Sequence, residues 1–238
     1  MESEAGQIPI SHKALAWFEA NKKQALSGVG VLLVVGVIVA FFLYRQNEAQ
    51  VAASEALSMV AMPQLAGSGA RPDPVEGYLK VAAMYPNSSA GARALLLAAG
   101  DLFVDGKYDE AKAKFEQFRR DYADSPYLGE ALLGIAACWD AQGKKTEAMA
   151  AYKELIDRRP NDSYVPTAKF ALARLHAAQN EPDQARTLFE DVERADPYGS
   201  LGDESRMQIE ELKRKFPKLL APVTAASTNA VPIKLQKR

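Results

Sequence analysis

The chain has 238 residues, one cysteine and two histidines, and its formal net charge at pH 7 is −1. A nearly neutral chain has no overall electrostatic footprint for DNA or RNA, and one cysteine forms neither an internal disulfide nor a metal site by itself. Alanine and other good helix formers dominate the composition, which predicts an all-α fold with a sizeable core.

The first predicted element is a transmembrane helix at residues 25–44, after a cytoplasmic segment at residues 1–24. The twenty residues ALSGVGVLLVVGVIVAFFLY carry no charge, and at about 1.5 Å per residue they match a hydrocarbon core about 30 Å thick. A secretory signal peptide is the alternative, because Val51-Ala52-Ala53 resembles a cleavage site. The length of the run and the charge of Arg45 before that site favour a retained span.

The charges beside this run predict its orientation. Lys13, Lys22 and Lys23 precede it, whereas only Arg45 follows within the next twenty residues. The more positive side stays in the cytoplasm, so we expect the N-terminus inside and the large C-terminal part outside. The stretch HKALAWFEANKKQ before the span predicts a short amphipathic helix with Trp17 at the level of the headgroups.

Residues 46–216 repeat with a period of 37 residues. A constant spacing of this size between several copies within one chain predicts a stacked helical repeat. Each copy has an apolar helix, a short turn, a second helix with alanine followed four residues later by an aromatic residue, and then a proline column. The alanine and aromatic columns are Ala111, Ala148 and Ala185, then Tyr78, Phe115, Tyr152 and Phe189; the proline column has Pro86, Pro160 and Pro197, with Ala123 in the remaining copy.

Turn residues mark the boundaries within each repeat. Gly106, Gly143 and Asn180 are predicted to end the first helices, since these residues tolerate a left-handed backbone. The segments PNS, ADS and PND are predicted to provide the N-caps of the following first helices. The first copy is irregular, with a helix continuing from the span and a loop at Pro63 to Pro74. The polar helix GDESRMQIEELKRKF is expected to cap the stack, and residues 217–238 to form a disordered or extended tail.

These columns resemble the tetratricopeptide repeat (TPR), a helix–turn–helix unit of about 34 residues. The small and large columns of its first helix correspond here to Ala99, Ala136 and Ala173, and to Leu102, Trp139 and His176. The resemblance implies an α-solenoid of about four units with a capping helix. It also implies a concave groove that binds proteins or peptides. By residue columns, the groove-lining residues are Arg93, Leu96, Phe103, Glu130, Leu133, Asp140, Phe170 and Arg174.

The sequence offers no pattern typical of a catalytic, cofactor or metal site. Cys138 lies on an apolar helix and is predicted to be a buried small residue, and His176 occupies a packing column. We therefore expect an interaction protein rather than an enzyme, with no cofactor, no metal, no nucleic acid and no small-molecule substrate. The columns that hold Lys and Asn in carboxylate-binding TPR proteins contain, in successive copies here, Leu96 and Gly100, Leu133 and Ala137, and Phe170 and Arg174, which favours apolar or extended-chain ligands.

The N-terminal part also resembles the start of YfgM-like proteins. Trp17, Phe18, Asn21 and Lys23 correspond to a short FF-x-x-N-x-K type motif before one span and a periplasmic TPR domain. The resemblance implies a single-pass protein of the bacterial inner membrane, ancillary to the Sec translocon, that hands exported chains to periplasmic chaperones. Two alternatives remain at this point. One is a structural subunit of an envelope assembly for cell division or outer-membrane biogenesis, and the other is an organelle receptor of opposite topology.

Overall fold

The structure is a computed structural model that describes residues 22–62 and 74–217. These residues contain nine α-helices and no strand: α2 Lys22–Ala61, α3 Pro74–Met84, α4 Ser89–Val104, α5 Tyr108–Asp121, α6 Leu128–Ala141, α7 Lys145–Arg158, α8 Val165–Ala178, α9 Pro182–Ala195 and α10 Ser200–Lys215. The all-α prediction is confirmed. The chain divides after Ala56 into two units, which are described separately. The predicted amphipathic helix before the span, most of the Pro63–Pro74 loop and the tail beyond Pro217 lie outside the described residues.

The described part of the first unit is the N-terminal portion of α2. Between Val31 and Tyr44, the exposed fraction of the large apolar side chains that the structure describes ranges from 49% at Val35 to 74% at Phe42. The stretch Gly30–Ala61 is long and apolar enough to cross a membrane. Helices of this length and composition serve as membrane spans or as signal sequences.

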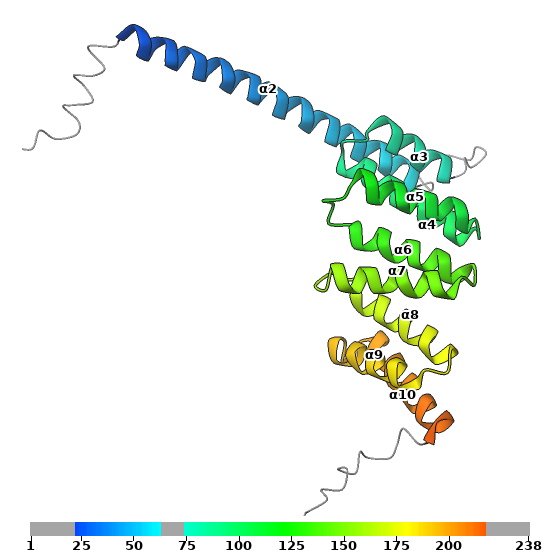
Figure 1. The fold of residues 1–238 in the computed structure, drawn as a ribbon. Coiled ribbons are helices and arrows are strands. Elements are labelled where there is room, and N and C mark those ends of the chain that lie inside the picture. The colour runs from blue at the N-terminus through cyan, green and yellow to red at the C-terminus, as the bar shows by residue number, and fades with distance from the viewer. Residues whose placement is uncertain (1–21, 63–73, 218–238) are drawn as a thin grey trace, which may run out of the picture. The chain divides into compact units, whose positions relative to one another are not determined.

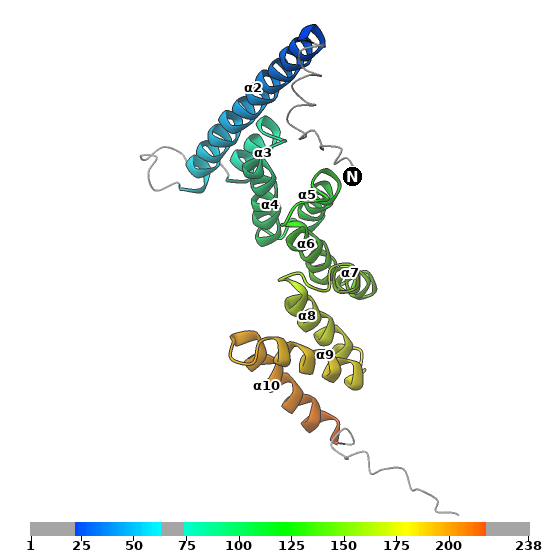
Figure 2. The ribbon, with the colours of Figure 1, turned by 90° about the vertical axis from the view of Figure 1, so that its left-hand side faces the viewer.

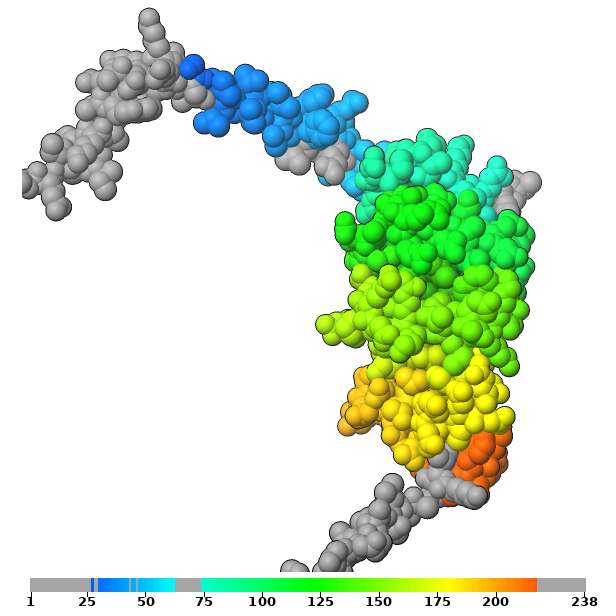
Figure 3. Space-filling view, in the orientation of Figure 1, coloured from blue at the N-terminus to red at the C-terminus, as the bar shows by residue number. Residues whose placement is uncertain are grey.

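The second unit stacks its helices in chain order (Figure 1). Each helix from α4 to α9 packs against the helix before it and the helix after it along the chain, and the quarter-turned view shows the same succession (Figure 2). In the space-filling view the colours follow one another down the stack as successive bands (Figure 3). Such a repeat array is stabilised mainly by contacts between neighbouring units. The predicted helical solenoid is therefore confirmed.

The alanine and aromatic columns form the core of the stack. Ala111, Ala148 and Ala185 are completely buried, and the rings four residues later are buried beside them. Residues i and i+4 share one helix face, so the small alanine lets two helices approach while the ring fills the neighbouring space. One core cluster joins α6, α7 and α8 around Tyr152 and Leu155, and another joins α8, α9 and α10 around Phe189.

The turns within the repeats follow the predicted glycine and asparagine column. Gly106 and Gly143 have φ angles of 77° and 73°, and Asn180 has a φ of 59°. These are left-handed conformations, which glycine adopts without steric cost and asparagine tolerates better than most residues. The predicted C-terminal ends of the first helices are confirmed at all three positions.

The predicted N-caps are correct for α4 but wrong for α6 and α8. The Ser88 hydroxyl accepts a hydrogen bond from the Gly91 amide at 2.8 Å, as an N-cap does. In the later copies, Ser125 and Asp162 accept from the amides of Tyr127 and Tyr164, only two residues on. These hydrogen bonds span only two residues and close a turn before the helix. Helices α6 and α8 therefore begin without a side-chain cap.

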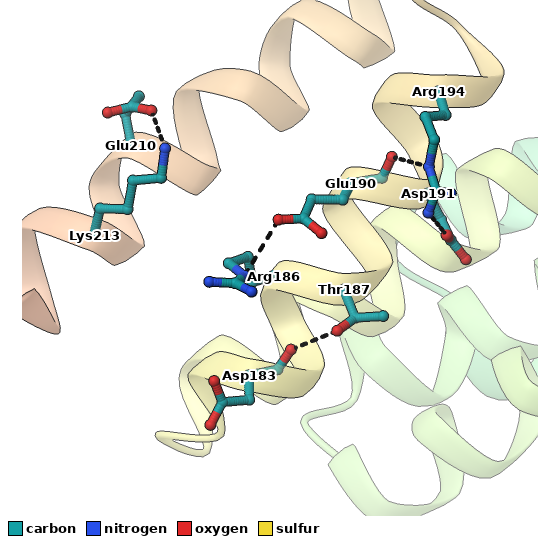
Figure 4. Close-up of polar contacts among 8 residues, drawn as sticks. All are labelled: Asp183, Arg186, Thr187, Glu190, Asp191, Arg194, Glu210 and Lys213. Carbon is teal, nitrogen blue, oxygen red and sulfur yellow. Dashed lines mark hydrogen bonds and ion pairs between the residues drawn. The ribbon is translucent and has the colours of Figure 1, made fainter. Parts of the chain in front are cut away.

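Charged side chains on the last two helices, α9 and α10, pair within their own helix. On α9, Arg186 pairs with Glu190, and Arg194 pairs with Asp191, within the same helix (Figure 4). On α10, Lys213 pairs with Glu210, which occupies a column that is alanine in the earlier first helices. A polar last helix of this kind covers the apolar end of a repeat stack and keeps it soluble.

Candidate protein-binding face

The first helices of neighbouring repeats approach each other on one side of the stack. Helix α4 contacts α6, and α8 contacts α10, in addition to their neighbours in the chain. No pair of second helices is joined to the same extent. The middle pair of first helices, α6 and α8, is not joined to this extent, so the closer approach holds for two of the three successive pairs. We call this side the first-helix face and define it by Arg93, Gly100, Glu130, Ala137, Asp140 and Arg174.

An ion-pair network connects three repeats at the N-terminal ends of these helices. Arg93 Nη1 of α4 lies 2.8 Å from Glu130 Oε2 of α6, and the guanidinium also lies over the Tyr127 ring at 5.3 Å from its centroid. The Tyr164 hydroxyl, just before α8, donates a hydrogen bond of 3.3 Å to the same Glu130 oxygen. Burial and the nearby Glu130 carboxylate raise the pKa of Tyr164. Two of the predicted groove residues, Arg93 and Glu130, are thus brought together.

A second polar group lies between α6 and α8. The Tyr152 ring belongs to the core and its side chain is only 3% exposed. Burial raises the pKa of Tyr152, the Asp140 carboxylate adds to the rise, and the Arg174 guanidinium opposes it. Two more predicted groove residues, one from each first helix, therefore influence the pKa of the same hydroxyl in opposite directions.

The remaining predicted groove residues divide by burial. Phe103 and Leu133 are half-buried, with the Phe103 ring 5.3 Å from that of Tyr108 on α5. Leu96 and Phe170 are 2% and 7% exposed, and Phe170 packs edge-on against Phe189. In this conformation, Leu96 and Phe170 support the face from beneath and present almost no surface to a ligand. That the face binds a protein stays a prediction.

Sequence reasoning missed the features that give this face its surface. Gly100 leaves open space: a Cβ built there meets no atom within 4 Å. Val104, one turn further along α4, is 83% exposed. The Tyr152 hydroxyl had only a weak signal in the sequence, since the same column has phenylalanine at Phe115 and Phe189 but tyrosine at Tyr78. The open space above Gly100 had no signal in the sequence, because it depends on how α4 packs with its neighbours.

Cys138 and His176, whose side chains could be reactive, both have positions that packing explains. Cys138 is completely buried, and burial raises the pKa of its thiol to about 11, so the thiol stays protonated at neutral pH. The prediction of a buried small residue is confirmed. His176 is half-buried, and its Nδ1 lies 2.5 Å from Glu181 Oε2, so it connects the end of α8 to the start of α9. Within the described residues, no group of three or more His, Cys, Asp or Glu side chains is placed to hold a metal ion.

Comparison with known proteins identifies the fold of the repeat region. The tetratricopeptide repeat-like domain model matches residues 105–209, a little under half of the chain. A tetratricopeptide repeat protein from Parabacteroides merdae is 12% identical with a TM-score of 0.52, covering 72% of this chain and 62% of that one. PcrH from Pseudomonas aeruginosa is 20% identical with a TM-score of 0.47, covering 53% of this chain and 94% of PcrH.

The Yersinia enterocolitica type III secretion chaperone SycD, solved with a peptide of the translocator YopD, is also 20% identical. It has a TM-score of 0.47, and the match covers 54% of this chain and 96% of SycD. No curated protein matches the chain. Identities of this size speak to fold and not to function. The repeat region of the chain is a TPR-like α-solenoid.

Proposed function

We propose that the chain is a membrane-anchored protein-interaction module, in which α2 holds the repeats at a bilayer and the first-helix face binds a partner protein. Membrane anchoring by α2 is supported above all by one observation: every described large side chain between Val31 and Tyr44 is exposed. Full burial of one such side chain is worth about 1.5–3 kcal/mol, so a segment that leaves all of them in water is strongly favoured to enter an apolar phase.

The fold supports the interaction role. Repeat solenoids present long continuous surfaces, and here that surface combines an ordered Arg93–Glu130–Tyr164 network with open space above Gly100. These features suit recognition of another polypeptide. The TPR-like match supports the same conclusion at the level of fold.

The proposed location in the cell and the proposed partner complex rest on the sequence. The lysine bias before the span supports a cytoplasmic N-terminus, and the resemblance around Trp17 and Phe18 supports a periplasmic repeat domain at the bacterial inner membrane, ancillary to the Sec translocon. In this role the module receives exported chains and passes them to periplasmic chaperones. A structural subunit of a cell-division or outer-membrane biogenesis complex is the competing function.

Affinity purification in mild detergent distinguishes the two roles. The full-length protein is compared with a version that lacks residues 1–44 and is exported by a cleavable signal. Translocon components and varied exported chains captured only by the full-length protein would support the translocon role. One fixed, stoichiometric set of envelope proteins captured by both versions would contradict it and favour the structural subunit.

Membrane topology is tested independently by cysteine labelling. Cys138 is buried and protonated, so it gives a low background toward maleimides. An Ala150→Cys variant places a thiol at an exposed position of α7. In intact spheroplasts, a membrane-impermeant maleimide is expected to label this variant without lysis. Labelling only after lysis would contradict the proposed orientation.

A further inference from the structure

The repeat stack has a junction at which its helices are joined less extensively than elsewhere. Among successive helices from α3 to α10, α7 and α8 have the least extensive contact. First helices contact each other across the junctions before and after it, in the pairs α4–α6 and α8–α10, but α6 and α8 are not joined to this extent. We call the junction between α7 and α8 the seam (Figure 2). It separates a front block, α3 to α7, from a rear block, α8 to α10.

Polar side-chain contacts join the repeats within each block. In the front block, they run from α4 and α5 to the repeat formed by α6 and α7: Arg93–Glu130 at 2.8 Å, Arg119–Glu154 at 3.9 Å and Gln142–Asp109 at 3.0 Å. In the rear block, they run from α9 to the helices on either side of it: Lys169–Asp191 at 2.6 Å and Arg206–Glu193 at 3.5 Å. Exposed pairs of this kind add little stability, but each has a preferred geometry and therefore limits the angle between the helices it joins.

The sequence explains why the contacts of the front block are not repeated across the seam. One period later, the three equivalent pairs are Glu130 and Thr167, Ile156 and Asp191, and Thr146 and Gln179. Each of these pairs contains a threonine or an isoleucine in place of a charged residue. Among the described residues, accordingly, no ion pair joins α6 or α7 to α8, α9 or α10.

The seam has weaker polar contacts in their place. The Tyr164 hydroxyl, just before α8, donates a hydrogen bond of 3.3 Å to Glu130 of α6, and Gln179 Nε2 lies 3.0 Å from the Met149 sulfur. The first bond is long for a hydroxyl donor, and a thioether sulfur is a weak acceptor. Beneath them lies the apolar core cluster that joins α6, α7 and α8. Apolar contact has no preferred direction, so it allows packed helices to slide by small amounts.

We propose that the seam is a hinge, at which the front block and the rear block move as two bodies and change the angle between them. The hydrogen bond from Tyr164 to Glu130 is its latch, because it holds the start of α8 against the first helix α6. Bending at the seam changes the distance between α6 and α8. The first-helix face therefore changes shape between its two halves, with Glu130 on one side of the seam and Arg174 on the other. This motion is a property of the repeats themselves and does not depend on which partner they bind.

Double electron–electron resonance on the full-length protein in lipid nanodiscs tests the hinge. Nitroxide labels are attached to cysteines that replace exposed residues of one column of the second helices. Glu76→Cys with Ala150→Cys spans two repeats within the front block, and Ala113→Cys with Thr187→Cys spans two repeats across the seam. Cys138 is completely buried, so the wild-type chain gives the labelling background. Freezing preserves the distribution of inter-label distances, which reports the range of angles between helices.

The seam pair is expected to give a wider distance distribution than the front-block pair. Tyr164→Phe keeps the ring, removes the latch, and should widen the seam-pair distribution further while the front-block distribution stays the same. Tyr122→Phe is the matched control, since it removes a hydrogen bond of 2.7 Å to the Pro86 carbonyl within the front block. This control should leave the seam-pair distribution unchanged.

A second set of variants adds the missing contacts to the seam. Thr146→Asp supplies a carboxylate for Gln179, as Asp109 does for Gln142 one period earlier, and Thr167→Arg supplies a guanidinium in the column opposite Glu130. Both positions are exposed. The double variant is expected to narrow the seam-pair distribution toward that of the front-block pair. General loosening of the repeats cannot narrow a distribution, and thermal unfolding of each variant checks that the repeats still fold.

Three outcomes would overturn the hinge or its parts. Distributions of equal width for the two label pairs in the wild type would show a stack that is uniformly rigid or uniformly elastic, with no hinge at the seam. Equal widening of the seam pair by Tyr164→Phe and Tyr122→Phe would reject the latch. A seam-pair distribution that the two threonine substitutions do not narrow would show that the absent polar contacts are not what frees the seam.

Discussion

The apolar stretch of α2 and helix α6 contain similar side chains but bury them to opposite degrees. Residues 31–44 are almost entirely Val, Leu, Ile, Phe, Gly and Ala, and the described large side chains are about half or more exposed. In α6, Leu132, Ile135 and Cys138 are buried against neighbouring helices. The difference is one of pattern. The repeats alternate small and large residues so that helices interlock, whereas residues 31–44 of α2 are apolar all round and have no polar face.

This comparison shows that hydrophobic content alone does not predict burial within a protein. A helix that is apolar on all sides needs an apolar environment on all sides, which a single layer of repeats does not provide. We therefore attribute stability to the repeats and attachment to α2, and the following substitutions test that division in order of decreasing effect.

Leu155→Ala is expected to produce the largest loss of stability. Leu155 is completely buried in the core cluster that joins α6, α7 and α8. Large-to-small substitutions at such sites cost about 2–5 kcal/mol. Val35→Ala in α2 is the comparison variant and should leave urea unfolding of the repeats unchanged. Equal effects of the two substitutions would contradict the division of roles.

Gly134→Ala is expected to destabilise the repeats by about 1–3 kcal/mol, because overpacking forces neighbouring groups to move. The new methyl group would lie 2.5 Å from the Phe115 ring, which is itself buried in the stack. Chemical denaturation followed by circular dichroism measures the change. A neutral result would mean that α5 and α6 are less tightly packed than the structure shows.

Gly143→Ala is expected to cost about 1–2 kcal/mol, since a side chain in the left-handed region carries a penalty of this size. Gly143 has a φ of 73° in the turn between α6 and α7. Asn180 takes the equivalent position with a φ of 59°, so Asn180→Gly serves as the reverse test and should stabilise slightly. Thermal unfolding midpoints of the two variants should move in opposite directions.

Gly100→Ala is expected to have the smallest effect and the opposite sign. The added methyl group meets open space, and alanine favours a helix interior over glycine by about 0.8–1 kcal/mol. The variant should therefore unfold at a higher urea concentration than the wild type. Destabilisation would show that the space above Gly100 is already occupied.

The fold was largely predictable because its signals are local and repeated. The columns of Ala148 and Tyr152, and the turn residues Gly143 and Asn180, recur at a fixed spacing, so several copies support each element. The N-caps of α6 and α8 were not predictable from the same columns. Ser125 and Asp162 have the right chemistry, but they bond two residues on and close a turn before the helix.

The candidate site was predictable only in part. Residue columns predicted Arg93, Glu130, Asp140 and Arg174; the structure pairs Arg93 with Glu130, and Asp140 and Arg174 both influence the pKa of Tyr152. The same columns included Leu96 and Phe170, which are buried. The difference between Gly100 and Gly134 could not be read from the sequence, because it depends on where the Phe115 ring lies relative to each helix.

Photo-cross-linking in living cells tests the central claim most directly. Benzoylphenylalanine is placed at Gly100 or Leu133 on the first helices, and at Ala113 or Ala150 on the exposed side of the second helices. We predict protein adducts from the first-helix positions and few or none from the second-helix positions, in membranes that contain the full-length chain. Adducts of equal strength from both sets, or adducts from the second helices alone, would contradict a binding role for the first-helix face.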